Sequence, residues 1–278
     1  MYAAPMQVAI RTGLCRPPLA PYTCRTMMTL IRLIGICLLA ASASAAAADC
    51  PGNPGAIGTE RIIAVEPGVQ VGRKHFPATL PLQPKEVVLT FDDGPWPGTT
   101  GSILDTLRKN CVKATFFMLG RSAASYPALA RQAAADGHSI GHHTYSHPLL
   151  RHMTAGAAEA EIDRGIAAIE AATGDRNVSA FFRFPGFASS PALLKLARER
   201  GMAVFGADLW ASDWDPMTAE QELRLVLARL EATRGGIILF HDTKKQTAAM
   251  LPAFLQALKS RGYRIVHVVP GGRAAPSL

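Results

Sequence analysis

The sequence predicts an α/β protein: a single-domain, distorted (β/α) barrel of about seven parallel strands with helices outside. Short apolar runs and amphipathic helix patterns alternate along the chain from about residue 85 to residue 270. Strands that alternate with helices pair in parallel, because each helix returns the chain to the start of the next strand. With 49% hydrophobic and 18% charged residues, the 278-residue chain can also bury a large core.

Residues 1–48 have the pattern of a signal peptide. Arg32 precedes the apolar stretch 33–41, and the small residues that follow offer two A-x-A cleavage sites at 43–48. Because 1–26 is a long lead for such a peptide, translation starting at Met27 or Met28 is an alternative, and a buried N-terminal helix is another. The apolar stretch is too short to span a bilayer. We therefore expect an exported protein, periplasmic or secreted, without a stable membrane anchor after cleavage.

The charge distribution gives no support to a nucleic-acid partner. The chain has 29 basic and 21 acidic residues, and 1–48 contains four of the arginines and no acid. The remainder has 25 basic and 21 acidic residues, a net charge of +4, without a long Lys/Arg run.

Residues 49–84 form an N-terminal arm that is rich in glycine and proline, with one strand expected at 61–65. Three of the five cysteines lie in the predicted signal peptide, which leaves Cys50 and Cys111 in the exported chain. In an oxidising compartment these two can form one disulfide that joins the arm to the domain. A buried Cys111 with a free Cys50 is the alternative.

Seven apolar runs rich in β-branched residues predict the strands of the parallel sheet. They cover residues 86–91, 114–119, 138–143, 180–184, 203–207, 237–240 and 263–269. Apolar spacing, N-caps and terminal glycines predict six helices between them. These begin at Thr99 or Thr100, cover 122–135 and 155–172, extend from Ser190 to Gly201, and include 223–230 and 250–258. Residues 271–278 form a tail.

Polar side chains follow five of these strands. In parallel α/β folds, functional groups gather at the C-terminal ends of the strands, so residues from distant parts of the chain converge there. The residues in question are Asp92, Asp93, His143, His147, Arg183, Asp208, Asp213, His241 and Asp242.

The two histidines His143 and His147 suggest a metal site. If residues 143–147 form a helical turn, the four-residue spacing places both imidazoles on one face, where they can bind one cation. Asp92 or Asp93 can add a carboxylate, and the other acid can face the reacting water. The alternative is that Asp92-Asp93-Gly94-Pro95 is only a turn.

Three further residues have candidate roles around this site. His241 can donate a proton, with Asp213 or Asp208 orienting its second ring nitrogen. Arg183 can hold Asp92 ionised through a bidentate pair. For each of them the alternative is a purely structural role.

Five segments resemble, in order, the motifs of the polysaccharide deacetylases. This is carbohydrate esterase family 4, the chitooligosaccharide and peptidoglycan deacetylase group with a NodB homology domain. The segments are 90–95 (TFDDGP), 143–147 (HTYSH), 183–185 (RFP), 213–214 (DW) and 239–242 (LFHD). The resemblance extends from about residue 85 to residue 269, and it implies a distorted (β/α) barrel catalytic domain over residues 85–270.

The resemblance also implies roles for individual residues. It implies a divalent metal, usually zinc with cobalt, nickel or manganese as alternatives, that is bound by Asp93, His143 and His147. It implies that Asp92 is the general base and His241 the general acid, and that their respective partners are Arg183 and Asp213.

Three positions are implied to contact the substrate. Leu239 and Trp214 match residues that line the pocket for the acetyl methyl group. Gly186 matches a position whose backbone N–H binds the oxyanion, although an aromatic residue commonly stands there. This departure changes the expected sugar contacts and leaves the chemistry unaffected.

The function implied is a metal-dependent hydrolase that removes N-acetyl groups from amino-sugar residues of a glycan and releases acetate. The glycan can be a chitooligosaccharide, peptidoglycan or an exopolysaccharide. The main alternative is an amidase that acts on a small non-sugar C–N bond with the same site. A non-haem iron oxygenase would leave Asp92, Arg183 and His241 unused, and an inactive binding protein would not need an intact site.

Overall fold

The structure is a computed structural model that describes residues 50–175 and 178–271. The chain divides into two compact units, residues 1–43 and 44–278, and every described residue belongs to the second unit. The predicted signal peptide, 1–48, lies outside the described residues, as does the predicted tail apart from Gly271.

The described part contains a ten-stranded sheet, and every pairing in it is parallel. The strands are β1 (Thr59–Val65), β2 (Gln70–Val71), β3 (Glu86–Asp92), β4 (Thr115–Met118), β5 (Ser139–His142), β6 (Phe181–Phe182), β7 (Ala203–Phe205), β8 (Leu209–Trp210), β9 (Gly236–His241) and β10 (Arg264–Pro270). All seven predicted strands are confirmed, as is the strand expected in the arm. Strands β2 and β8 were not predicted, because two residues are too few to show a periodic pattern.

The two strands of the arm lie at opposite edges of the sheet. The order is β1-β10-β3-β4-β5-β6-β7-β2, with β9 paired to β3 and β8 paired to β9. Only residues 66–69 connect β1 to β2, and such a segment spans at most about 18 Å. The sheet therefore curves until its edges approach each other, although no pairing between described strands closes it. The predicted α/β class with a parallel sheet is confirmed, and the barrel is incomplete.

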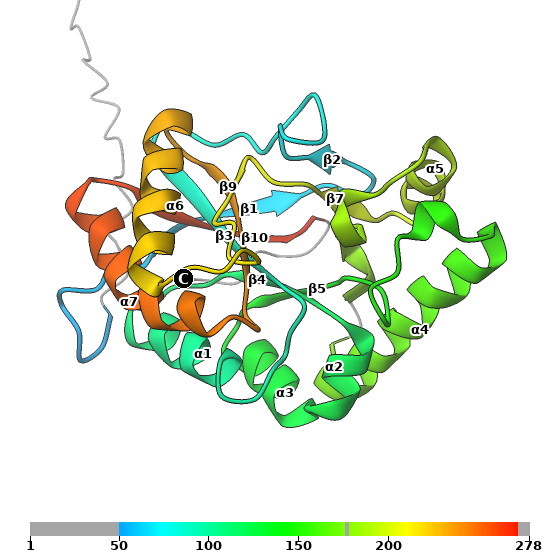
Figure 1. The fold of residues 1–278 in the computed structure, drawn as a ribbon, viewed down its shortest axis with the longest axis horizontal. Coiled ribbons are helices and arrows are strands. Elements are labelled where there is room, and N and C mark those ends of the chain that lie inside the picture. Colours follow the sequence, from blue (N-terminus) through cyan, green and yellow to red (C-terminus); the bar gives the residue numbers. More distant parts are fainter. Residues whose placement is uncertain (1–49, 176–177, 272–278) are drawn as a thin grey trace, which may run out of the picture. The chain divides into compact units, whose positions relative to one another are not determined.

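Seven α-helices flank this sheet in the described part of the chain (Figure 1), with α1, α2 and α3 along its lower side, α4 at the right, and α6 and α7 at the left. They are α1 (Thr100–Lys109), α2 (Gly120–Ser125), α3 (Pro127–Ala135), α4 (Ala155–Thr173), α5 (Pro191–Glu199), α6 (Ala219–Thr233) and α7 (Lys245–Ser260). The single helix expected over 122–135 is wrong. Proline disfavours helical geometry in the residue before it, and the chain breaks at Tyr126, which has φ −130° and ψ 56°.

Side-chain alternation along β3 separates two layers of core. Val87 and Leu89 pack toward the helices. Val88 faces the opposite side, where residues of the arm such as Ile63 and Val71 cover it. Because successive side chains point to opposite faces, Asp92 lies on the same side as Val88. The arm thus completes the inner layer from which the site residues project.

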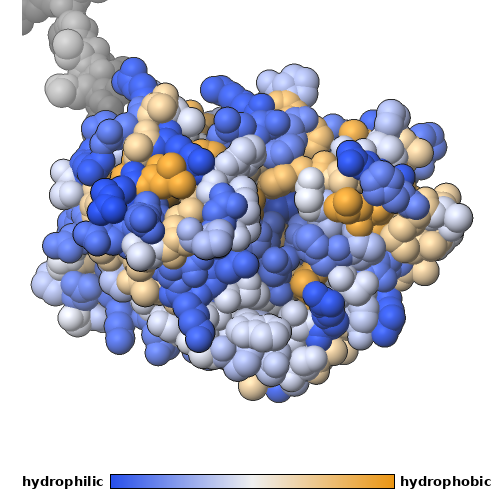
Figure 2. Space-filling model, in the orientation of Figure 1, coloured by the Kyte–Doolittle hydropathy of each residue, from blue (hydrophilic) through white to orange (hydrophobic). Residues whose placement is uncertain are grey.

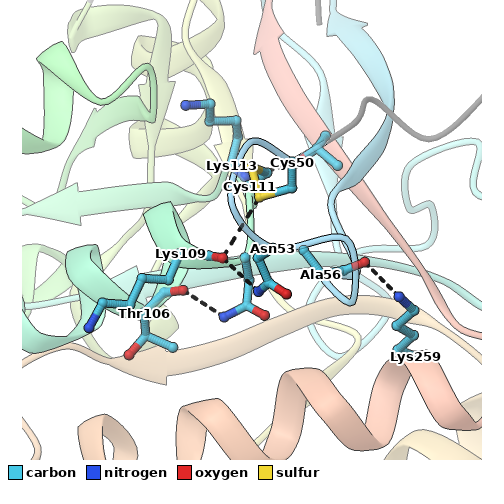
Figure 3. The surroundings of a disulfide bond; sticks show 10 residues. Cys50, Asn53, Ala56, Thr106, Lys109, Cys111, Lys113 and Lys259 are labelled. Carbon is cyan, nitrogen blue, oxygen red and sulfur yellow. Dashed lines mark hydrogen bonds between the residues drawn. A yellow bond between two sulfur atoms is a disulfide. The ribbon is translucent and has the colours of Figure 1, made fainter.

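A disulfide joins the start of the arm to the segment after α1. Figure 3 shows Cys50 bonded to Cys111, two residues beyond the end of that helix. Nearby, Asn53 Nδ2 donates to the Lys109 carbonyl at 2.9 Å, and Lys259 Nζ donates to the Ala56 carbonyl at 2.9 Å. Of the two alternatives for these cysteines, the structure shows the disulfide, and it fixes the arm at the end of the sheet opposite the candidate site.

The surface in Figure 2 is mostly hydrophilic, and its hydrophobic residues form small separate groups. Three large hydrophobic side chains are exposed within residues 50–175 and 178–271, namely Trp96, Leu149 and Trp214. None of the described helices combines the length and the apolar character that crossing a bilayer requires.

Candidate active site

Asp92 and His241 lie at the ends of neighbouring strands. The register of β3 and β9 pairs Asp92 directly with His241. Asp92 is almost completely buried, with 2% of its surface exposed. Burial raises the pKa of Asp92, and the positive charge of Arg183 opposes that rise. A buried carboxylate beside a guanidinium can accept a proton from a group that reaches its free oxygen.

Arg183 is fully buried behind Asp92. Its Nη1 donates to Asp92 Oδ1 at 2.6 Å and to Thr90 Oγ1 at 2.9 Å. Its Nη2 donates to the Gly206 carbonyl at 2.9 Å, and its Nε donates to the Phe205 carbonyl at 3.3 Å. The expected bidentate pair is therefore wrong, because the other guanidinium donors bind carbonyls at the end of β7. The second carboxylate oxygen of Asp92, Oδ2, accepts no hydrogen bond from Arg183.

Asp93, His143 and His147 converge on one point. One ligand atom from each lies within 4.8 Å of the other two. Asp93 Oδ1 is 3.7 Å from His143 Nε2 and 3.6 Å from His147 Nε2. The helical turn expected over 143–147 does not form. Instead, Thr144 and His147 adopt left-handed backbone angles, with φ of 69° and 70°, and these bring the two imidazoles together.

This donor set fits a divalent cation. Asp93 Oδ1 is buried and has no hydrogen-bond partner among the described residues. Burial lowers the pKa of His143 to about 3, so its ring is neutral at physiological pH. His143 Nδ1 donates to the Arg183 carbonyl at 2.7 Å, which leaves the lone pair of Nε2 directed toward Asp93. Two imidazole nitrogens and one carboxylate oxygen form a ligand set typical of zinc, with positions left for water and substrate.

The loop that carries the two histidines rests on α4. Ser146 donates to Glu161 Oε1 from its backbone N–H at 2.5 Å and from its hydroxyl at 2.6 Å. Gly165 faces the backbone of Thr144, and a Cβ at that position would lie 2.6 Å from the Thr144 carbonyl carbon. A glycine at this crossing is what allows α4 to approach the loop.

His241 is held by Asp213. Asp213 Oδ1 lies 2.7 Å from His241 Nδ1, and Asp213 Oδ2 accepts the backbone N–H of His241 at 2.6 Å. Burial lowers the pKa of His241, but the hydrogen bond and charge of Asp213 prevail and raise it to about 9. The opposite ring nitrogen, Nε2, lies 3.9 Å from Asp93 Oδ2. A protonated Nε2 therefore faces the centre of the site.

Asp208, the other candidate partner of His241, has a different position. Its Oδ1 accepts the backbone N–H of Arg73 at 2.8 Å. Its Oδ2 accepts the hydroxyl of Thr79 at 2.7 Å and the backbone N–H of Ile237 at 2.8 Å. Asp208 thus binds the arm to the sheet, and the partner of the histidine is Asp213.

Glu222 and Thr247 extend the hydrogen bonds behind Asp213, and neither was predicted as a site residue from the sequence. Thr247 Oγ1 lies 2.9 Å from Asp213 Oδ2 and 2.9 Å from Glu222 Oε1. One hydroxyl holds one proton, so it donates to only one of the two carboxyl groups. Burial and the charge of Asp213 raise the pKa of Glu222 to about 7. Below pH 7 Glu222 therefore mostly carries a proton, which it can donate to Thr247 while the Thr247 hydroxyl donates to Asp213.

A signal for Glu222 was present in the sequence. Glu222, Val226 and Leu230 follow one another at four-residue spacing, so the acid shares the buried face of α6. An acid on the apolar face of a helix indicates a buried partner.

Two of the three predicted substrate residues, Leu239 and Trp214, lie beside His241. Leu239 is 2% exposed, and it projects on the same side of β9 as His241. The Trp214 ring is 45% exposed and lies edge-on to the His241 ring, with centroids 5.8 Å apart. Gly186 is exposed, and a Cβ there would lie 3.0 Å from the exposed Leu149 side chain. Of these residues, Trp214 thus reaches the surface beside His241.

Gly186 has no aromatic ring, but the next residue, Phe187, has one. The Phe187 ring stacks on His75 of the arm, with centroids 3.7 Å apart. Lys74 lies over the Trp210 ring at 5.2 Å. The arm therefore forms part of the wall on this side of the site.

A family model described as polysaccharide deacetylase matches residues 80–205. The chitooligosaccharide deacetylase of Azorhizobium caulinodans is 32% identical over 193 residues, which cover 64% of this chain and 90% of that protein. The chain belongs to the polysaccharide deacetylase family. The matched range contains Asp92, Asp93, His143, His147 and Arg183.

Two further similar proteins are peptidoglycan deacetylases. The peptidoglycan-N-acetylglucosamine deacetylase PgdA of Listeria monocytogenes is 36% identical over 187 residues, which cover 66% of this chain and 38% of that protein. The chain thus spans less than half the length of PgdA. The solved structure of the Bdellovibrio bacteriovorus peptidoglycan deacetylase Bd3279 superposes with a TM-score of 0.70 at 32% identity, and the match covers 78% of this chain and 60% of that chain.

Proposed function

We propose that this polysaccharide deacetylase is a metal-dependent hydrolase that removes N-acetyl groups from amino-sugar residues of a glycan and releases acetate. One observation carries the proposal: a base and an acid flank the metal-binding residues from different strands. Asp92 Oδ2 lies 3.8 Å from His143 Nε2, and His241 Nε2 lies 3.9 Å from Asp93 Oδ2. An amide carbon placed between them has a proton acceptor on one side and a proton donor on the other.

Asp93, His143 and His147 are the residues that would hold the metal. Their neutral imidazoles and single carboxylate favour zinc, with cobalt, nickel or manganese as alternatives. When bound, such a cation supplies Lewis-acid chemistry to oxygen atoms that reach it.

The protein's own groups account for the proton transfers. Asp92 accepts a proton from the attacking water while the water oxygen bonds to the acetyl carbon. The backbone N–H of Gly186 donates to the oxygen that becomes negative. His241 Nε2 then donates its proton to the sugar nitrogen as the C–N bond breaks. The products are acetate and a free amine, and the atoms of one water are divided between them.

The remaining residues position these groups. Arg183 holds one oxygen of Asp92 and so directs the other toward the water. Asp213 keeps His241 protonated through its raised pKa of about 9. Leu239 and Trp214 form the apolar surface for the acetyl methyl group.

We further propose that the protein acts outside the cytoplasm, in the periplasm or as a secreted enzyme. The disulfide between Cys50 and Cys111 supports this, because such bonds persist in oxidising compartments. The signal-peptide pattern of residues 1–48 is consistent with the same location.

Acetate release from chitooligosaccharides, peptidoglycan and an exopolysaccharide tests the activity, with chelator and added zinc as controls. Asp92→Asn should abolish turnover and keep the metal, whereas His143→Ala should lose both. Metal content measured beside activity separates the two roles. Normal turnover by Asp92→Asn would refute the assigned base, and release only from small non-sugar amides would favour the amidase alternative.

A further inference from the structure

A cleft of about 720 Å³ opens directly beside the metal-binding residues. Asp93 and His147 line it on the side of the active site. The residues that line it elsewhere include Arg121, Lys244, Trp96 and Tyr126. The cleft therefore adjoins the reacting group and can hold a neighbouring part of the same substrate.

Two cations in this cleft lack a carboxylate partner. Arg121 and Lys244 form no ion pair and no side-chain hydrogen bond with any residue in the described part of the chain. Some basic residues elsewhere in the described part are paired with acids, as Arg200 is with Glu159 and Asp163. The one acid lining the cleft is Asp93, whose charge a bound metal would offset. The cleft is thus positively charged and suited to an anion.

An aromatic surface lies in the same cleft. Trp96 is 47% exposed, and its ring lies edge-on to that of Tyr126, with centroids 5.8 Å apart. The backbone N–H of Trp96 donates to Thr100 Oγ1 at 2.7 Å, and the Thr100 hydroxyl donates to Asp242 Oδ2 at 2.6 Å. One partly buried and one buried hydrogen bond therefore fix the segment that presents the tryptophan. A fixed, exposed indole offers an apolar face on which a sugar ring can stack.

We infer that this cleft binds a sugar next to the one that is deacetylated, and that Arg121 and Lys244 bind a carboxylate on that part of the glycan. The inference rests on the proposed function and names two residues that would favour a glycan with a carboxylate over a neutral one. Chitin oligomers are neutral and offer these cations no partner. In peptidoglycan the carboxylate belongs either to the lactyl ether of the muramic acid or to the attached peptide, and both present the same anion.

Kinetics on matched substrates test this inference. The substrates are chitotetraose, a peptide-free tetrasaccharide of alternating N-acetylglucosamine and N-acetylmuramic acid, and the same tetrasaccharide with its peptides. The two substrates that contain N-acetylmuramic acid are also tested with their carboxyl groups amidated. Arg121→Gln and Lys244→Gln should each raise KM for the carboxylate-bearing glycans by roughly three- to tenfold, with kcat and the kinetics on chitotetraose unchanged. Lys245→Gln is the matched control, because this neighbour does not line the cleft.

Binding to an inactive background gives a second readout. In the Asp92→Asn protein, the Kd for the carboxylate-bearing glycan should rise by a similar factor when Arg121 or Lys244 is neutralised, and added salt should raise it too. A preference of the peptide-bearing glycan over the peptide-free one would place the carboxylate on the peptide.

The outcomes that contradict the two proposals differ. Equal kcat/KM for the carboxylate and amidated glycans, with no effect of either variant, would overturn the inference and leave the deacetylase activity standing. Absence of acetate release from every glycan by the zinc-loaded protein would overturn the proposed function itself.

Discussion

The side chains around His241 define where protons lie in the site. His241 is protonated at neutral pH because Asp213 raises its pKa to about 9 against the effect of burial. Behind Asp213, the hydroxyl of Thr247 links it to Glu222, whose pKa is raised to about 7. Below pH 7 Glu222 is therefore mostly neutral, and the negative charge of this pair of carboxyl groups lies on Asp213, which faces the histidine.

Replacing Asp213 should change the pH dependence of the reaction. In Asp213→Asn the burial of His241 is no longer opposed by its main partner, so the pKa of the imidazole should fall. The alkaline limb of the kcat/KM profile should move to lower pH, and activity at pH 8 should fall further than activity at pH 6. Asp215→Asn, an exposed acid two residues away, is the control and should keep the wild-type profile. Identical profiles for both variants would argue against the general-acid role.

Glu222 should make stability depend on pH. Its pKa is about 7 in the folded state and about 4.5 in the unfolded state, so the folded protein retains a proton that the unfolded chain releases. The contribution is complete below pH 4.5 and is lost as pH rises through 7, about 2–3 kcal/mol in all. Urea unfolding of wild type and Glu222→Gln should show the wild type losing stability over this range relative to the variant. Parallel curves would contradict the protonated state of Glu222.

At the scale of elements, the metal site depends on how closely α4 approaches the histidine loop. The loop has no regular secondary structure between β5 and the 3₁₀ turn Leu150–His152. Hydrogen bonds to Glu161 and the bare backbone of Gly165 position it. The spacing of the two imidazoles is thus a property of helix packing as well as of the loop sequence.

Gly165→Ala should weaken metal binding without touching a ligand. The added methyl would meet the Thr144 backbone, and relief of that overlap requires the loop or helix to shift, at a cost of about 1–3 kcal/mol. Zinc content after dialysis and the melting temperature should both fall. Gly156→Ala in the same helix is the matched control, since no atom lies within 4 Å of its added Cβ. Full zinc occupancy and unchanged melting of Gly165→Ala would show that the contact is unimportant.

At the scale of the whole molecule, the arm is part of the fold. It supplies a strand to each edge of the sheet, covers the inner core layer, and contributes His75 and Lys74 to the wall near the site. Its disulfide lies at the opposite end of the sheet from the catalytic groups. The end of the arm that carries the disulfide therefore contributes to stability, and the other end lies near the catalytic groups.

Removing the disulfide should lower stability and spare catalysis. Cys50 and Cys111 are 61 residues apart, and closing a loop of that length stabilises the folded state by about 4 kcal/mol in the chain-entropy treatment. Cys50→Ser with Cys111→Ser should unfold at lower urea concentration, while kcat and zinc content at 25 °C stay near the wild-type values. A large loss of activity at 25 °C would mean that the arm carries strain from the disulfide to the site.

Much of this architecture follows from local sequence patterns. Apolar runs bounded by turn residues predicted the seven main strands, because a buried strand leaves a continuous apolar segment in the sequence. The same patterns placed Asp92, Arg183 and His241 at strand ends. The resemblance to polysaccharide deacetylases then implied the metal ligands, and the similarity to known deacetylases confirmed the family.

What the sequence alone determined was the order of strands and helices and the set of polar residues at one end of the sheet. The tertiary structure decided which of them touch: Asp213 rather than Asp208 holds His241, Arg183 binds Asp92 through one nitrogen, and a loop brings the imidazoles together. It also brought Glu222 to the site and opened a cationic cleft beside it. The physical reason is that the patterns of strands and helices depend on residues that are close in the sequence. The partner of a side chain depends instead on strand register and on how helices cross, and these are determined only when the chain packs.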